Sequence, residues 1–503
     1  MILIELTAAI DAAGTLQTFY VAAGRYVTAP GDTPAHTAFL DRLLDPGSLG
    51  RHAYADGRTG GATRLETGEI VIANADGALD GWINYSFDGR AVVIRSGEAG
   101  AYPASFTTLL TGTAEGIEAT FDKIVVRLRD KSWMFDKPVC GSTYAGNNSL
   151  PNGLEGAQQD IKGRRKPKTY GKVYNVSPPC VNTSRLIYEV GVCNAVDAGY
   201  DRGATLTKGA DYTSQSDMET NVPAAGNFRA WPAGGYVRLG SQPAGQVTFD
   251  VTQGAAAGNR TVAQILKQLA LDAGIASGAI NSADVTALDT ANSAVVGIWV
   301  DDETSFLAAM DQVAASVGAW YGFDAGGTLR MGQLTAPSGT PALTLYDYDI
   351  GEAIERVPPK DIGIPAWRMT LGYARNFTVQ ASDLAGSVSA VRAAWLAEDF
   401  RREKAEDAAV KTQWLLAPEP ESMGLLTAQA DASTEVTRQL NLYKVRRDVY
   451  DVPLSIERAA GLDLMAVVRL VYARFNMGAG RDFRLIGLRF ELAEARAVLS
   501  LWG

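Results

Sequence analysis

Residues 69–94 read EIVIANADGALDGWINYSFDGRAVVI, in which short apolar runs alternate with turn-forming pairs. The run at 82–87 ends at Asp88-Gly89, and a second apolar run follows at 91–94. Asp-Gly pairs favour tight turns because glycine accepts positive φ, so the stretch predicts a β-hairpin. Similar strand and turn signals on both sides of it assign residues 1–135 to a barrel-like, antiparallel β domain.

Strand signals resume after a long polar segment, and we expect a second β domain at 136–255. Within it lies a long basic loop, 141–169, and a loop of this length is usually functional or ordered by a partner. Six of the eleven residues from 162 to 172 are basic, and only one is aromatic. The basic side chains are Lys162, Arg164, Arg165, Lys166, Lys168 and Lys172. They fit either a solvated loop or a loop that docks onto an acidic surface of a neighbouring subunit.

The apolar period then changes from that of strands to that of helices. Thr261 and Gln264 form a capping-box pattern, and the apolar residues that follow predict a helix ending at Gly274. A second helix is expected at 302–317, followed by a hairpin that pairs 320–323 with 328–331. These elements predict a small α/β module of two helices and a hairpin at 256–340.

We expect residues 341–503 to form a second barrel-like β domain with helical insertions. Leu384, Val388, Val391 and Trp395 recur at helical spacing, which predicts a helix over about 383–410. A shorter helix is expected near 430–442, and three antiparallel strands close the chain. The predicted fold class is therefore α+β, predominantly antiparallel β and multidomain, with two barrel-like β domains flanking small α/β modules.

Composition excludes several classes of protein. With 503 residues, 47% hydrophobic and 20% charged, the chain is globular rather than largely disordered. A formal net charge of -10 argues against a protein that holds nucleic acid by neutralising phosphates. No apolar run approaches 18 residues, so stable membrane insertion is not expected. The first eleven residues include Glu5 and Asp11 and no basic region, which is unlike a secretory signal.

Residues suited to catalysis or metal binding are sparse. The two histidines, His36 and His52, lie in stretches that read as loops. Asp301-Asp302-Glu303 fits the first turn of a helix better than a pair of catalytic carboxylates. The cysteines Cys140, Cys180 and Cys193 form no metal-binding or disulfide pattern, and we expect buried or half-buried structural thiols. We therefore predict no catalytic residue, no metal site and no cofactor.

Several stretches resemble the tail-tip and baseplate-hub proteins of tailed bacteriophages and gene transfer agents. The similar stretches are 69–77, 163–178, 320–329, 480–487 and 499–503, and they are spread over nearly the whole chain.

The resemblance implies a structural virion protein rather than an enzyme. Such hubs are homotrimers that join the hexameric tail tube to the tail tip, so that two related barrel-like domains per chain present six similar faces to the ring. They surround or close the channel for DNA ejection, without binding the DNA specifically, and anchor a central spike, fibre or tape-measure protein. The expected location is the tail tip of a virion assembled in the bacterial cytoplasm. The alternatives are a tail-associated cell-wall-degrading enzyme and a receptor-binding tail protein.

Overall fold

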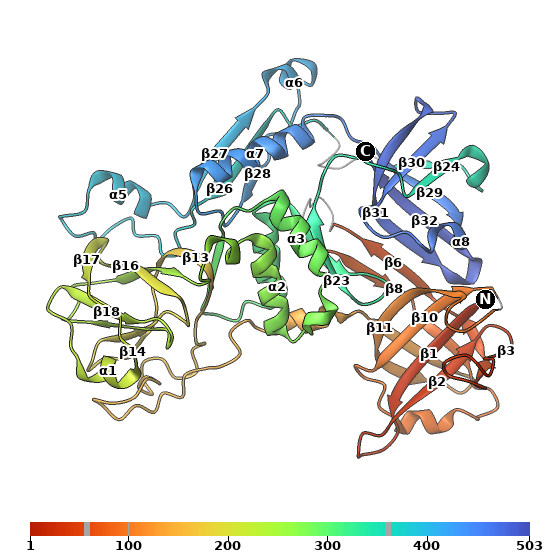
Figure 1. Ribbon diagram of the computed structural model, residues 1–503, viewed down its shortest axis with the longest axis horizontal. Helices are drawn as coiled ribbons and strands as arrows, with labels where there is room; N and C mark the ends of the chain where they lie inside the picture. Colours follow the sequence, from red (N-terminus) through yellow and green to blue (C-terminus); the bar gives the residue numbers. More distant parts are fainter. Residues whose placement is uncertain (55–60, 99, 358–363) are drawn as a thin grey trace.

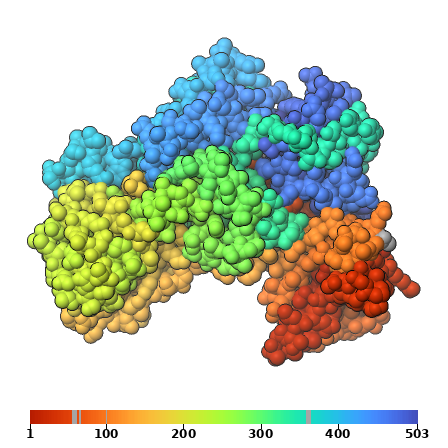
Figure 2. Space-filling model, viewed as in Figure 1, coloured from red at the N-terminus to blue at the C-terminus, as the bar shows by residue number. Residues whose placement is uncertain are grey.

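The computed structural model describes residues 1–54, 61–98, 100–357 and 364–503. Figure 1 shows β structure at both ends of the longest axis and helices between them. The N-terminal and C-terminal parts of the chain lie together at one end, and the β structure that follows residue 168 forms the other. Figure 2 shows that one side of the molecule is hollowed between the two ends, so that the chain has the outline of an arch.

The N-terminal sheet has nine strands in the order β3-β4-β2-β1-β10-β11-β12-β9-β5. Alternate residues of β1, such as Ile4 and Leu6, are buried in one core, whereas Leu3 faces a second, aromatic cluster. This alternation is the period expected of a strand covered on both faces. The strands are β1 (Ile2–Ala9), β2 (Leu16–Ala22), β3 (Tyr26–Val27), β4 (Ala38–Asp41), β5 (Leu43–Asp45), β9 (Ile70–Ala73), β10 (Ala91–Gly97), β11 (Phe106–Ala119) and β12 (Lys123–Arg129).

The strand predicted at 82–87 is wrong, because the chain forms the 3₁₀ helix η1 (Asp80–Asn84) there. The Asn74 side chain accepts from the Leu79 backbone N–H at 2.8 Å and donates to Asp80 Oδ1 at 2.8 Å. These bonds close a turn that leads into η1 rather than into a strand. Trp82 is nevertheless buried, with its ring centroid 4.7 Å from that of Phe19. The apolar pattern therefore predicted correctly that Trp82 is buried, but it predicted the wrong backbone conformation.

The C-terminal sheet has the order β24-β30-β31-β32-β29-β25, and its last three strands in the chain are antiparallel as predicted. The short elements β6 (Ser48–His52) and β8 (Arg64–Thr67) join it, with β6 pairing β31 from Glu491 to Gly487. One hydrophobic core is shared between this sheet and the N-terminal sheet. The elements are β24 (Leu343–Tyr346), β25 (Glu355–Val357), β29 (Val449–Ser455), β30 (Val467–Tyr472), β31 (Met477–Glu491), β32 (Arg496–Trp502), α8 (Ile456–Ala459), η5 (Asp347–Asp349) and η6 (Leu492–Glu494).

The middle of the chain builds a second nine-stranded sheet, in the order β14-β15-β19-β18-β17-β16-β20-β13-β21. Residues 168–171 of β13 pair with β21, and residues 172–176 pair with β20. Gly171 lies at this change of partner with φ +72°, and a Cβ there would come within 2.0 Å of the Val296 carbonyl oxygen. The elements are β13 (Lys168–Val176), β14 (Cys180–Asn182), β15 (Ile187–Glu189), β16 (Ala195–Asp201), β17 (Ala204–Lys208), β18 (Asn227–Trp231), β19 (Tyr236–Leu239), β20 (Val247–Thr252), β21 (Gly297–Val300) and α1 (Gln215–Thr220).

A helical module connects the two ends. Helix α2 starts as predicted, because the Thr261 hydroxyl accepts from the Gln264 backbone N–H at 3.3 Å. The predicted hairpin is also present, whereas α3 was not predicted and α4 begins four residues later than Asp302. The elements are η2 (Lys131–Asp136), η3 (Ala257–Asn259), α2 (Val262–Ala273), η4 (Ser277–Ala279), α3 (Ser282–Ala291), α4 (Phe306–Ala315), β22 (Ala319–Phe323) and β23 (Leu329–Gln333), with β7 (Gly61–Ala62) paired to β22.

The helix predicted over 383–410 is wrong before residue 390 and again after residue 396. Helix α5 covers only the middle part, and Arg401–Glu406 is the strand β27, which pairs with β26. The helix expected near 430–442 is confirmed as α7. The elements of this region are α5 (Ala390–Leu396), α6 (Ala408–Gln413), α7 (Gln429–Tyr443), β26 (Arg368–Tyr373), β27 (Arg401–Glu406) and β28 (Glu421–Met423).

The fold is therefore α+β and mostly antiparallel β, with two curled half-barrel sheets, as the sequence predicted. Within the described residues, no helix combines the length and the apolar character needed to cross a membrane.

Candidate functional site

The basic loop predicted at 141–169 ends two residues earlier, because β13 begins at Lys168, and it doubles back on itself. The backbone of Tyr144 forms two hydrogen bonds across it. The Tyr144 N–H donates to the Arg164 carbonyl at 3.0 Å, and the Gly163 N–H donates to the Tyr144 carbonyl at 2.9 Å. Tyr144 and Ile161 are buried in a small core with residues of the second sheet and α1. The loop is therefore packed onto its own domain.

Five of the six predicted docking residues pair with acids of the same chain. Arg164 lies 2.6 Å from Asp301, Arg165 lies 3.1 Å from Glu303, and Lys166 pairs with Glu155. Lys168 lies 3.8 Å from Asp272, and Lys172 lies 3.9 Å from Asp197. Lys162 is exposed and has no ion pair with the described residues. The structure thus brings most of these charges onto internal partners.

The acidic run at 301–303 supplies two of the ion-pair partners of the basic loop. We expected it in the first turn of a helix, but α4 starts at Phe306 and its N-cap is Ser305. Asp301 and Glu303 instead hold the two arginines of the basic loop, and the Asp302 carboxylate accepts from the Thr304 backbone N–H at 2.8 Å.

A buried carboxyl group lies beside the basic loop. Glu189 is 8% exposed and lines a cavity of about 310 Å³ together with Lys166, Tyr170 and Asp272. Burial raises the pKa of Glu189, and the nearby Lys166 opposes part of that rise. The Tyr170 hydroxyl donates to Asp272 Oδ2 at 2.6 Å, which fixes one wall of the cavity.

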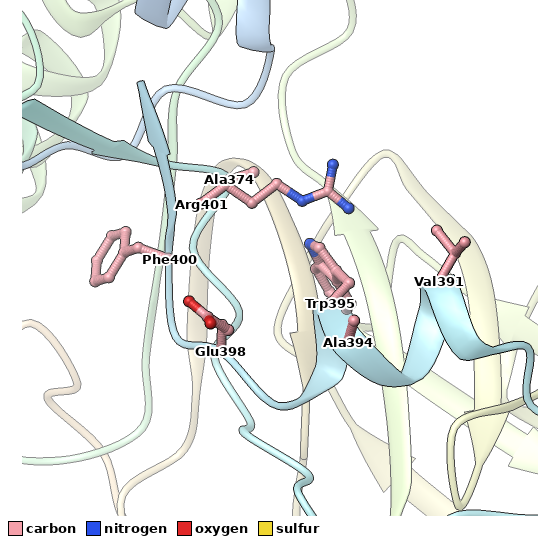
Figure 3. A pocket seen from close by; sticks show the side chains of 7 residues that line it. All are labelled: Ala374, Val391, Ala394, Trp395, Glu398, Phe400 and Arg401. Carbon is pink, nitrogen blue, oxygen red and sulfur yellow. The ribbon is translucent and has the colours of Figure 1, made fainter. Parts of the chain in front are cut away.

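A second cavity region, which we call the α5 cleft, lies between α5, β27 and the second sheet. It consists of adjoining cavities of about 240 and 410 Å³ that share Ala374, Val391, Trp395 and Arg401. Tyr174, Asp250 and Arg392 line the larger one. Figure 3 shows the side chain of Arg401 extending from β27 toward Trp395 of α5, with Val391 one helical turn away.

The α5 cleft contains buried hydrogen-bond donors that lack an acceptor among the described residues. Arg392 stacks over Tyr200 and Trp395, with its Cζ atom 4.1 and 4.3 Å from the two ring centroids. Its Nε and Nη2 atoms are buried without an acceptor among the described residues.

Two carboxyl groups line the α5 cleft, Glu398 and Asp250. Glu398 pairs with Arg402 at 3.2 Å, and both oxygens of Asp250 are also occupied. One accepts from the Asn175 backbone N–H at 2.8 Å and the other from the Tyr200 hydroxyl at 2.9 Å. Burial raises the pKa of Asp250, and Arg392 opposes that rise. Arg401 is exposed and has no ion pair with the described residues. The chemistry of the cleft therefore suits an anionic group with an apolar or planar part.

The cysteines are buried or half-buried, as expected. Burial raises the pKa of Cys140 to about 11 and that of Cys193 to about 12, and it also raises the pKa of Cys180. These thiols are therefore protonated near neutral pH, which disfavours nucleophilic use.

The histidines lie far from the two cavity regions along the chain. His36 is in a loop as expected, whereas the expectation for His52 is wrong, because it lies in β6 opposite Gly487. In the part of the chain that the structure describes, no group of three or more His, Cys, Asp or Glu side chains could hold a metal ion.

Comparison with known proteins finds similar solved structures but no matching family model and no matching curated protein. A 43 kDa tail protein of prophage MuSo2 from Shewanella oneidensis is 12% identical, covers 99% of this chain and 98% of its own, and has a TM-score of 0.41. A tail protein from Neisseria meningitidis MC58 is 9% identical, with coverages of 99% and 96% and a TM-score of 0.43.

A chain of the virion of a native gene transfer agent particle is also similar. It is 17% identical, covers 73% of this chain and 91% of its own, and has a TM-score of 0.44. Two of these neighbours are thus described as tail proteins and one as part of a gene transfer agent virion. At such low identities and scores, they assign no role to any residue of this chain.

Proposed function

We propose that this chain is a structural protein of a phage-like tail, and that three copies form a hub between the tail tube and the tail tip. The hub would surround or close the channel through which DNA leaves and anchor a central spike, fibre or tape-measure protein. Assembly would take place in the bacterial host before the tail tip is complete.

The observation that carries the proposal is a likeness between the two sheets that share a core. In each, three consecutive antiparallel strands form a meander with a long middle strand, β11 with 14 residues and β31 with 15. Each middle strand carries a register shift against both neighbours. Bulges bend a strand and increase its twist, which suits sheets that curl into half-barrels.

Two similar units per chain would allow a threefold hub to match a sixfold ring. Three copies would present six such units, which matches a hexameric ring, whereas one unit per chain would leave half of the ring subunits without an equivalent contact. The curled sheets would supply a wall, and the hollowed side in Figure 2 gives each copy a concave surface that could face a central axis. The formal net charge of -10 would weaken the attraction between this wall and passing phosphates.

The basic loop 141–169 remains part of the proposal as a contributor to assembly. Because Tyr144 and Ile161 are core residues, deleting the loop would damage its own domain as well as any contact with another subunit. Lys162 is the better probe, since it is exposed and lacks an internal ion pair with the described residues. If the loop docks onto an acidic surface, Lys162→Glu should reduce incorporation into particles without altering the thermal unfolding midpoint.

The test is to express the chain with its tail partners and to count and locate it in purified particles. We expect three copies per particle at the distal end of the tube. Particles that assemble and eject DNA normally without the chain would contradict the proposal. So would clearing of peptidoglycan by the purified chain that disappears on substitution of a single carboxylate while particles stay intact.

A further inference from the structure

The turn between β11 and β12 carries an exposed apolar side chain. Phe121 is 96% exposed, the largest fraction among the large apolar side chains that the structure describes. Asp122 beside it is also exposed. An exposed benzyl ring next to a carboxylate is a combination that a partner surface can recognise through both groups.

The tip is held in a fixed conformation rather than free to collapse. Thr120 N–H donates to the Lys123 carbonyl at 2.8 Å, and Asn74 N–H donates to the Asp122 carbonyl at 2.7 Å. The Thr120 hydroxyl also donates to Asp122 Oδ1 at 3.2 Å. A preorganised tip loses little conformational entropy when it enters a partner, which favours binding.

The α5 cleft offers the complementary chemistry. Trp395 and Tyr174 both line the cleft and pack edge to face against each other, with ring centroids 6.4 Å apart, and Val391 at the rim is 79% exposed. Arg392 has two guanidinium nitrogens without a hydrogen-bond acceptor among the described residues, and Arg401 is exposed. An aromatic ring can stack on these aromatic side chains while an adjacent carboxylate meets the guanidinium groups.

We propose that the Phe121–Asp122 tip of one copy of this chain inserts into the α5 cleft of a second copy. The inference rests on the proposed function, in which three copies form the hub, and it names the contact that joins them. A cavity of roughly 150 Å³ can hold benzene. The larger part of the cleft, about 410 Å³, therefore has room for the Phe121 ring and the Asp122 carboxylate.

The positions of the two surfaces suit a closed ring. The N-terminal sheet, which carries the tip, and α5 lie toward opposite ends of the longest axis in Figure 1. Two different complementary surfaces at opposite ends make a heterologous, head-to-tail contact, and such a contact closes into a ring when the rotation between copies allows it. The tip cannot reach the cleft of its own chain in this arrangement, so the contact must be between copies.

The first experiment compares the mass of the full-length chain and three variants by light scattering over a range of concentrations. Phe121→Ala removes the ring, and Val391→Glu places a carboxylate at the rim, where it opposes Asp122. Leu416→Ala is the matched control, because Leu416 is 93% exposed but lies outside the cleft. We expect a mass near three times 53.4 kDa for the wild type and the control. Phe121→Ala and Val391→Glu should weaken association at least about 30-fold, the effect of losing a central aromatic contact.

The second experiment distinguishes a head-to-tail contact from any other. Phe121→Ala keeps an intact cleft, and Val391→Glu keeps an intact tip, so mixing the two should yield dimers joined by a single contact. Two variants that remain separate in the mixture would overturn the inference. A charge exchange adds a further test, since Asp122→Arg and Arg401→Glu should each weaken association and should partly restore it when combined in one chain.

Failure of this inference is distinguishable from failure of the proposed function. If Phe121→Ala and Val391→Glu remain trimeric, the contact lies elsewhere and the inference is wrong, while the hub proposal stands. If the wild type stays monomeric at every concentration, the inference is also wrong. The hub proposal is decided separately, by whether the wild-type chain occupies the tail tip in particles.

Discussion

Two clusters of positive charge in this molecule behave in opposite ways. In the basic loop 141–169 the charges are contiguous in sequence, yet Arg164, Arg165 and Lys166 each meet an acid of the same chain. In the α5 cleft, Arg392 and Arg401 come from a helix and a strand, and neither pairs with a described carboxylate. The density of charge along a sequence therefore does not indicate whether those charges remain unpaired once the chain is folded.

The largest expected effect is the loss of packing between the basic loop and the second sheet. Tyr144 is 1% exposed, and Tyr144→Ala should lower the local free energy of unfolding by about 3–5 kcal/mol, the usual cost of truncating a buried aromatic residue. Hydrogen exchange should show lost protection in residues 141–189 and no change around α5. Equal loss of protection in both regions would mean that the two clusters belong to one cooperative unit.

The converse variant should lower the local stability around the α5 cleft and leave that of the basic loop unchanged. Leu396 is fully buried, and its carbonyl accepts from the side chain of Asn376 at 3.0 Å and from the backbone N–H of Gln380 at 2.8 Å. Leu396→Ala should cost about 2–4 kcal/mol of local stability because it leaves a cavity beneath α5. The measurement is hydrogen exchange over residues 376–401. Protection of α5 that stays at the wild-type level would show that the cleft does not depend on this side chain.

The buried acids of the two regions predict a dependence of stability on pH with the same sign. Burial raises the pKa of Glu189 above 4.5 and that of Asp250 above 3.8, so the folded chain binds these protons more tightly than the unfolded chain. Stability is therefore lost as pH rises from the ordinary pKa through the raised one.

Glu189→Gln and Asp250→Asn should each flatten that fall, as measured by thermal unfolding midpoints across the same pH range. Glu219→Gln is the control, since it changes a less buried glutamate of the same domain. A steeper fall in either variant would contradict the sign derived from burial.

The smallest effect concerns the ion pairs of the basic loop. Arg164 and Asp301 are partly exposed, with side-chain exposures of 42% and 26%, and such pairs are worth about 0.2–1 kcal/mol. A double-mutant cycle with Arg164→Ala and Asp301→Ala should return a coupling energy in that range, decreasing as salt is added. A coupling of several kcal/mol would mean that the pair is a principal anchor of the loop rather than one of several weak contacts.

The sequence predicted elements where local signals and tertiary packing agree. The N-cap at Thr261 and the hairpin around 320–331 are examples, because each depends on residues that are close in the chain. The helix predicted over 383–410 from apolar spacing fails at 401–406, although Glu398 and Arg402 are four residues apart, the spacing of ion pairs along a helix. Arg402 does pair with Glu398 at 3.2 Å, but it does so while lying in a strand paired with β26.

The candidate site was predictable only in part. Helical spacing places Arg392 and Trp395 on neighbouring turns of one helix, which the sequence indicates. Arg401 and Tyr174 join them only because β27 and β13 pack beside α5, and no local pattern encodes that approach. In the same way, Asp301 lies 137 residues from its partner Arg164 along the chain, so this pairing could not be read from the basic run itself.

The most direct test of the proposed hub is the structure of an intact particle at a resolution that traces this chain. The account predicts three copies at the distal end of the tail tube, with the N-terminal and C-terminal sheets of each copy occupying alternate positions beneath the six ring subunits. Six copies in one ring, or copies placed away from the tube end, would contradict it.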